Sequence, residues 1–237
     1  MTYDEWIDFA RGEPRILGVV VTGSRGRGAL VHDESDWDLR VLVRDGDGEF
    51  ARTLETPHGS EVEVSARTLT DFRASPQWDR YSYSHVAVPV DKLDGEIARL
   101  IEAQGTLAPD EAEALARESL GAYTNALYRS SRDGERGLDL AARLDAADGV
   151  SALLTALFAI GRRVRPFNKY LRWELETHPL DVWDTAELLA LLDGALGGGA
   201  EGQCALLRAV EPHLRAHGYG DEIDAWEPHV AFLRGAA

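Results

Sequence analysis

The feature that most constrains the fold is a strand–turn–strand segment near the N-terminus that carries two closely spaced aspartates. Residues 15–21 (RILGVVV) form an apolar run typical of a buried strand, and the glycine-rich turn TGSRGRG follows it. Residues 36–43 (DWDLRVLV) alternate and then become apolar, which predicts a second strand. Side chains two residues apart on a strand share a face, so we expect Asp36 and Asp38 side by side.

These two carboxylates and the preceding turn indicate a site for a metal-bound phosphate. Carboxylates held side by side repel each other, and a divalent cation relieves that repulsion. Oxygen ligands suit Mg²⁺, which also binds nucleotide phosphates. Gly23 lets the backbone approach a phosphate closely, and the Ser24 hydroxyl with nearby N–H groups would donate hydrogen bonds to it. Arg25 and Arg27 would add charge-assisted bonds.

A third carboxylate is expected on a neighbouring strand, where residues 61–66 alternate (EVEVSA). Glu61 and Glu63 share a face there, and we favour Glu63 because valines flank it as in a core strand. Three carboxylates would hold two Mg²⁺ ions about 3.5–4 Å apart. This chemistry favours nucleotidyl transfer, in which an acceptor hydroxyl attacks the α-phosphate of a nucleoside triphosphate and pyrophosphate leaves. Glu63 would also accept the proton of that hydroxyl.

The combined pattern resembles the signature of the polymerase-beta-like nucleotidyltransferase superfamily, above all its small bacterial branch of minimal and aminoglycoside nucleotidyltransferases. That signature is Gly-Ser-x-Ala-Arg-Gly, a short spacer and Ser-Asp-x-Asp-Leu. The matching positions are Gly23, Ser24, Arg27, Gly28, Ser35, Asp36, Asp38 and Leu39. Gly26 replaces the small alanine, a mild change, and Glu63 stands where the third carboxylate is usually aspartate. The resemblance implies an enzyme that transfers AMP from ATP to a hydroxyl of a small acceptor.

The chain changes character near residue 95, which predicts an α+β protein of two domains. Residues 1–95 are expected to form a nucleotidyltransferase domain, a mixed β-sheet flanked by helices. Within it we expect a hairpin of 50–56 and 61–66, a short helix at 68–74 and a strand at 85–90. Residues 96–237 are rich in alanine and leucine at helical spacing and predict an all-α bundle. Its helices are expected at 109–128, 138–144, 150–164, 166–176, 185–196, 204–217 and 223–233.

Residues 162–174 concentrate cations and aromatic residues in an otherwise acidic chain. Lys169, one of only two lysines, is expected to reach the triphosphate across the cleft between the domains. The alternative is a solvated helix face whose cations pair with surrounding acidic groups. By analogy with antibiotic-modifying enzymes, Glu174 and Glu176 are further candidates for the general base. The choice of the base among Glu61, Glu63, Glu174 and Glu176 stays open.

Charge and composition restrict the class of function. The chain has 25 Lys and Arg against 41 Asp and Glu, a formal charge of −16. Such a surface argues against broad nucleic-acid binding and would attract a cationic acceptor such as an aminoglycoside, although acidity also serves solubility alone. No apolar run approaches the ~20 residues of a membrane helix, the N-terminus carries no signal-peptide pattern, and Cys204 is the single cysteine. We therefore expect no membrane contact and a cytoplasmic location.

Two other functions stay open. The chain could be an antitoxin-like nucleotidyltransferase that modifies a partner protein, although its long helical domain argues against this. It could instead be a nucleotide-binding regulatory pseudoenzyme, against which the retention of both Asp36 and Asp38 counts. A homodimer that pairs through the helical domain is also left open.

Overall fold

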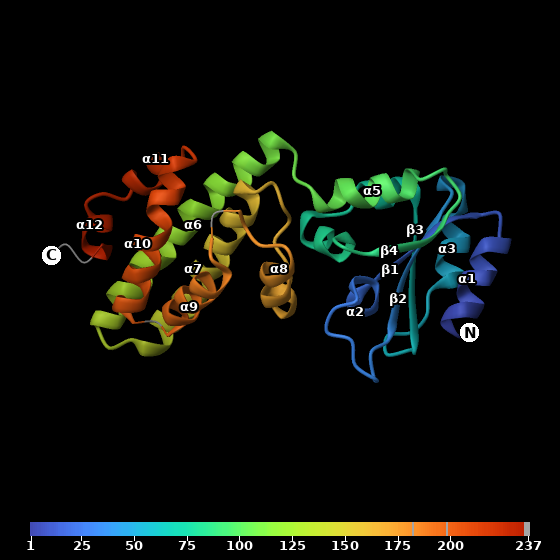
Figure 1. Ribbon diagram of the computed structural model, residues 1–237, viewed down its shortest axis with the longest axis horizontal. Coiled ribbons are helices and arrows are strands. Elements are labelled where there is room, and N and C mark those ends of the chain that lie inside the picture. The colour runs from blue at the N-terminus through green and yellow to red at the C-terminus, as the bar shows by residue number, and fades with distance from the viewer. Residues whose placement is uncertain (182, 198, 235–237) are drawn as a thin grey trace. The chain divides into compact units, whose positions relative to one another are not determined.

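The computed structural model describes residues 1–181, 183–197 and 199–234. The chain divides into two compact units, residues 1–106 and 107–237 (Figure 1). The first unit extends past residue 95 because α5 (Glu96–Gly105) buries Ile97 and Ile101 among the apolar residues of the sheet. The predicted α+β class, a mixed sheet flanked by helices and then an all-helical region, is confirmed. In the part of the chain that the structure describes, no helix combines the length and apolarity needed to cross a bilayer.

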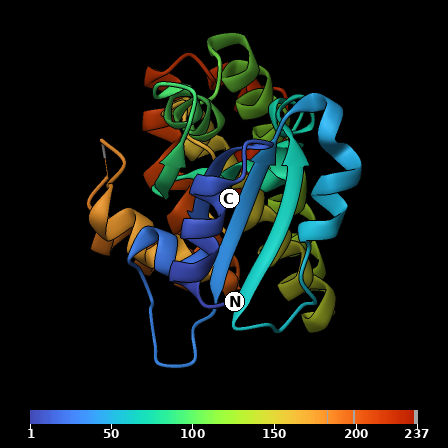
Figure 2. The ribbon, with the colours of Figure 1, turned by 90° about the vertical axis from the view of Figure 1, so that its right-hand side faces the viewer.

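A four-stranded sheet in the order β3–β2–β1–β4 forms the centre of the first unit. β1 (Ile16–Thr22) pairs antiparallel with β2 (Trp37–Val43) and with β4 (Ala87–Asp91), whereas β2 pairs parallel with β3 (Val62–Thr68). Figure 2 shows β2 and β3 side by side and running in the same direction. Four of the predicted strands, at 15–21, 36–43, 61–66 and 85–90, are confirmed to within two residues at their ends.

The predicted hairpin between residues 50–56 and 61–66 is wrong. Gly48–Leu54 forms a helix, α3, and not a strand. The physical reason is the parallel pairing of β2 with β3, which requires a crossover connection in place of a tight turn. α3 fulfils this role by burying Ala51 and Leu54 against the sheet.

The two faces of the sheet are covered by different helices. On one face, Leu39 and Val41 of β2 pack with buried residues of α1 (Tyr3–Gly12) and α3. On the other face, Leu42 packs with residues of α4 (Leu69–Arg73) and α5. Because side chains alternate along a strand, the even-numbered positions of β2 belong to this second face. Two 3₁₀ turns, η1 (Asp45–Asp47) and η2 (Gln77–Tyr83), complete the unit.

The described part of the second unit is helical. Long helices α6 and α7 pack along each other, and buried leucines such as Leu153, Leu188 and Leu207 fill the core that they share with the later helices. The elements are α6 (Pro109–Glu135), α7 (Asp139–Ile160), η3 (Asn168–Tyr170), α8 (Leu171–Thr177), α9 (Thr185–Leu196), α10 (Ala200–Ala216), α11 (Gly220–Asp224) and α12 (His229–Leu233).

Two helix predictions in this unit are wrong. Residues 138–144 and 150–164 were expected as separate helices, but α7 runs through Asp139–Ile160 without a break. Gly149 lies where α7 packs on α6, since a Cβ there would meet the Cβ of Ala126 at 3.3 Å, so this glycine permits close packing and does not end the helix. Residues 223–233 were expected as one helix but form α11 and α12, because Pro228 has no N–H with which to continue α11.

Candidate active site

The three acidic residues predicted from the sequence lie together at the N-terminal ends of β2 and β3. Asp36 immediately precedes β2, and Asp38 is register partner of Glu63 on β3. One carboxylate oxygen from each residue lies within 4.8 Å of the other two, and all three residues are half-buried. Carboxylates at this separation repel one another, so the arrangement favours the binding of a cation.

The glycine-rich turn lies directly against Asp38. It forms a short helical turn, α2 (Gly23–Arg27), in which Gly23 has a φ of +65° and Ser24 is buried. A Cβ on Gly23 would lie 1.9 Å from Oδ2 of Asp38, so the carboxylate occupies the space that a side chain would fill. The Thr22 hydroxyl donates a hydrogen bond to the backbone carbonyl of Asp38 at 3.3 Å. Turn and acidic strand therefore fix each other in place.

Gly26 has a steric role that the sequence did not reveal. A Cβ at this position would lie 2.0 Å from the carbonyl oxygen of Val21. The expectation that glycine is a mild replacement for alanine here is wrong, because alanine would push α2 away from β1. Only glycine allows the turn to lie this close to the strand.

The two arginines of the turn contact the protein itself. Arg27 donates hydrogen bonds to the carbonyl oxygens of Gly23, at 3.0 Å, and of Tyr81, and its Cζ lies 4.7 Å from the centroid of the Tyr81 ring. Arg25 donates from Nε to the carbonyl oxygen of Ser35 at 2.8 Å. The Arg25 bond braces the loop that leads to Asp36, and the Arg27 bonds connect the turn to η2. Contact of either arginine with a nucleotide stays a prediction.

Two donors that the sequence analysis missed orient Glu63. The backbone N–H of Gly59 and Nδ1 of His58 lie 2.5 and 2.7 Å from its Oε1. The hydrogen bond from Gly59 is the main cause that lowers the pKa of Glu63, and the hydrogen bond to Glu63 raises the pKa of His58. Both shifts favour the charged forms. The sequence contains one signal for these two donors: the turn PHGS places His58 and Gly59 just before the strand that carries Glu63.

Positive charges flank the carboxylates along the same face of the sheet. Arg40 of β2 donates a hydrogen bond to Oγ of Ser65 on β3 at 2.7 Å, and its charge helps to lower the pKa of Glu63. Further along, Arg67 forms an ion pair with the buried Asp79 at 3.1 Å. The face therefore combines an acidic end with a row of cations.

The other predicted residues belong to the second unit. Lys169 lies in η3, with its Nζ 4.8 Å from the ring centroid of Tyr170. Glu174 is buried and forms an ion pair with Arg163, and Glu176 is exposed on α8. The functions of these residues in nucleotide or acceptor binding stay predictions.

Comparisons with known proteins add a distant structural likeness. No family model matches the chain, and no curated protein matches its sequence. Among solved structures, the chain is similar to a nucleotidyltransferase-like protein from Exiguobacterium sibiricum 255-15, with 12% identity and a TM-score of 0.39. The match covers 90% of this chain and 77% of the other. A likeness this weak carries no information about the function of the chain.

Proposed function

We propose that this chain is a Mg²⁺-dependent nucleotidyltransferase that transfers a nucleoside monophosphate, AMP from ATP as the first candidate, to a hydroxyl of a small acceptor. The observation that carries the proposal is the convergence of Asp36, Asp38 and Glu63 within 4.8 Å, next to the glycine-rich turn. Divalent ions bound there would neutralise the triphosphate and stabilise the attacking and leaving oxygens of an in-line displacement.

The donor set fits a hard divalent cation. All three groups are carboxylates, and oxygen ligands are those that Mg²⁺ prefers. The contact with Gly23 restricts the position of Asp38, and the hydrogen bonds from His58 and Gly59 restrict Glu63. Such outer partners orient ligands before the metal binds. Glu63 is longer than the usual aspartate of the family that the chain resembles, yet its carboxylate still lies within 4.8 Å of the other two.

The lowered pKa of Glu63 distinguishes between its two predicted functions. A carboxylate stabilised by the Gly59 N–H holds a proton weakly, which makes it a better cation ligand than a general base. We therefore propose that Glu63 is a ligand first. Gly23, which has no side chain, keeps the backbone of α2 open beside these carboxylates, where the phosphates of the nucleotide would lie.

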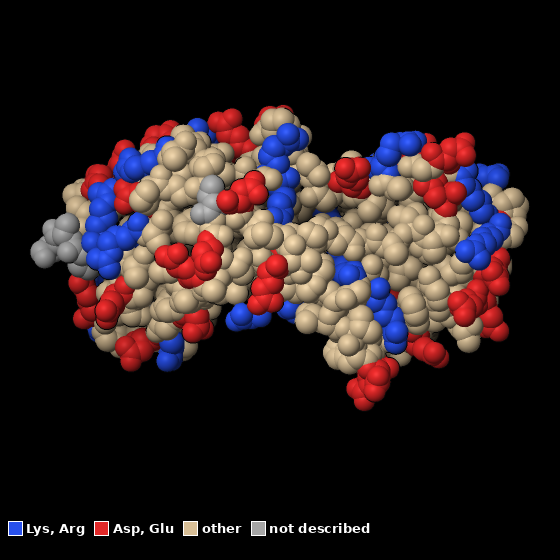
Figure 3. All heavy atoms as spheres, in the orientation of Figure 1, with Lys and Arg blue, Asp and Glu red and all other residues tan. Residues whose placement is uncertain are grey.

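The acceptor class is proposed from charge. The formal charge of −16 attracts cations, so protonated aminoglycosides are the first acceptors to test. On the face drawn in Figure 3, acidic and basic side chains are interspersed and form no acidic patch. The preference for a cationic acceptor is therefore based on the net charge alone.

The test is transfer of labelled AMP from ATP, with Mg²⁺, to a panel of small hydroxyl acceptors. We expect Asp38→Asn to lose about 100-fold or more in rate, because changes in groups that merely support metal ligands already cost 10- to 100-fold. Asp33→Asn is the matched control, since Asp33 is exposed in the loop that precedes β2 and lies outside the triad. Nucleotide binding without any transfer by the wild-type protein would refute the proposal and support a pseudoenzyme.

A further inference from the structure

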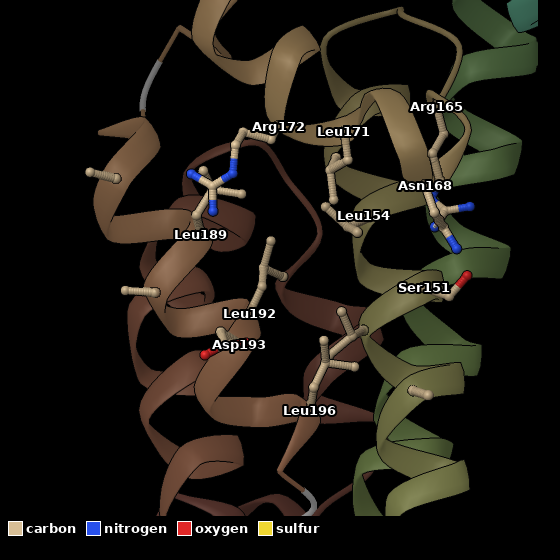
Figure 4. Close-up of a pocket in the computed structure, with 14 residues that line it drawn as sticks. Ser151, Leu154, Arg165, Asn168, Leu171, Arg172, Leu189, Leu192, Asp193 and Leu196 are labelled. Carbon is tan, nitrogen blue, oxygen red and sulfur yellow. Dashed lines mark hydrogen bonds between the residues drawn. The ribbon is translucent and has the colours of Figure 1, made fainter. Parts of the chain in front are cut away.

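The second unit contains a pocket of its own where α7, α8 and α9 meet. Its volume is about 700 Å³, within the range of about 300–1,000 Å³ that is typical of small-molecule sites. Figure 4 shows side chains from all three helices, among them Leu154, Leu171 and Leu192, pointing into this space. The pocket is therefore an apolar cavity of ligand size.

A few polar side chains line the same pocket. They are Ser151, Arg165, Asn168, Arg172 and Asp193, and the rest of the lining is aliphatic. Arg172 forms an ion pair with Glu176 at 3.4 Å, whereas Arg165 is in no ion pair among the residues that the structure describes. Figure 4 places Arg165 and Asn168 together along one wall, next to Ser151.

Arg165 is a half-buried cation without a carboxylate partner among the residues that the structure describes. It donates a hydrogen bond to Oδ1 of Asn168 at 2.6 Å, whereas its Nε is buried and makes no hydrogen bond. Burial lowers the pKa of Arg165, and no neighbouring charge offsets that effect. A guanidinium that is withdrawn from water without a counterion is costly. This cost is expected where a residue is retained to bind an anion.

We propose that this pocket binds an amphipathic anion, a small molecule with an apolar body and a carboxylate head. The aliphatic walls would contact the body, and the guanidinium fork of Arg165 would donate to the carboxylate, for which its planar geometry is suited. A cationic ligand would meet repulsion from Arg165, and a neutral one would leave its guanidinium without a counterion. The site lies wholly within the second unit, so its test does not depend on nucleotide transfer.

The experiment is a calorimetric titration of the full chain with decanoate below its micelle concentration, compared with decanol and decylammonium. We expect decanoate to bind about 10- to 100-fold more tightly than decanol, the gain of a charge-assisted hydrogen bond, and decylammonium not to bind. Arg165→Met should remove this preference. Arg143→Met should keep it, because Arg143 is exposed on α7 and lies outside the pocket.

Two further readouts separate binding from a structural role. Arg165→Met should leave the melting temperature of the free protein unchanged or raise it, since the variant removes a half-buried cation that has no counterion. Ala190→Trp, which fills the pocket from an exposed position on α9, should abolish binding of decanoate and decanol alike. The proposal is overturned if decanoate shows no saturable binding or if the three probes bind with equal affinity. It is also overturned if the Arg165→Met variant binds decanoate as the wild type does, or if the variant melts well below the wild type.

Discussion

Substitution of Gly23 by alanine tests how the turn positions the acidic strand. The new Cβ would lie 1.9 Å from Oδ2 of Asp38, and an ordinary contact begins at 3.4 Å, so the carboxylate must move by about 1.5 Å. A misplacement of ~1 Å at a reacting centre costs about 100-fold in rate. The left-handed backbone at φ +65° adds about 1–2 kcal/mol of destabilisation for any residue with a Cβ. We therefore expect Gly23→Ala to lose both stability and at least about 100-fold in transfer.

Gly28 provides the matched control for this substitution. Its φ of +64° is nearly the same, but nothing lies within 4 Å of a Cβ built there. Gly28→Ala should therefore lose the same 1–2 kcal/mol in urea unfolding and retain transfer activity. Equal loss of activity in both variants, or full activity in Gly23→Ala, would refute the proposed coupling between the turn and Asp38.

Two further predictions concern the same site. The pKa of His58, followed by NMR of its ring protons, should lie above 6.5 and return toward 6.5 in Glu63→Gln. The contribution of His58 to the free energy of unfolding is complete below pH 6.5 and is lost as the pH rises through the folded-state pKa. The contribution of Glu63 is lost as the pH falls below 4.5 and passes through the lowered pKa of that carboxyl. A His58 pKa that does not respond to Glu63→Gln would contradict the pairing. Gly26→Ala should lower the free energy of unfolding by about 1–3 kcal/mol through the clash with the Val21 carbonyl. Gly46→Ala is the control and should be close to neutral, because nothing lies within 4 Å of a Cβ built there. A neutral Gly26→Ala would show that α2 moves away from β1 without cost.

The strands of the sheet and the pair of aspartates could be predicted because their signals are local. Apolar runs and alternation identify strands, and the two-residue period places Asp36 and Asp38 on one face. Helix α1 was overlooked although its signal was present, since Thr2 and Glu5 have the spacing of a capping box and form one. These features need only a few neighbouring residues to be interpreted.

Other features depend on residues far apart in the chain. The crossover helix α3 was mistaken for a strand because its sequence does not show whether β2 and β3 run parallel. Helix α7 was predicted as two helices, 138–144 and 150–164, because the close contact of Gly149 with Ala126 on α6 is visible only after packing. The contact of Gly26 with the Val21 carbonyl depends in the same way on how the turn folds back on β1.

The most direct test of the proposed metal site is a crystal of the protein soaked with Mn²⁺ and a non-hydrolysable ATP analogue, with anomalous diffraction recorded for manganese. We predict anomalous peaks within coordination distance of Asp36, Asp38 and Glu63, with the α-phosphate against the turn at Gly23. Crystals that bind the analogue yet show no manganese at these carboxylates would contradict the proposal.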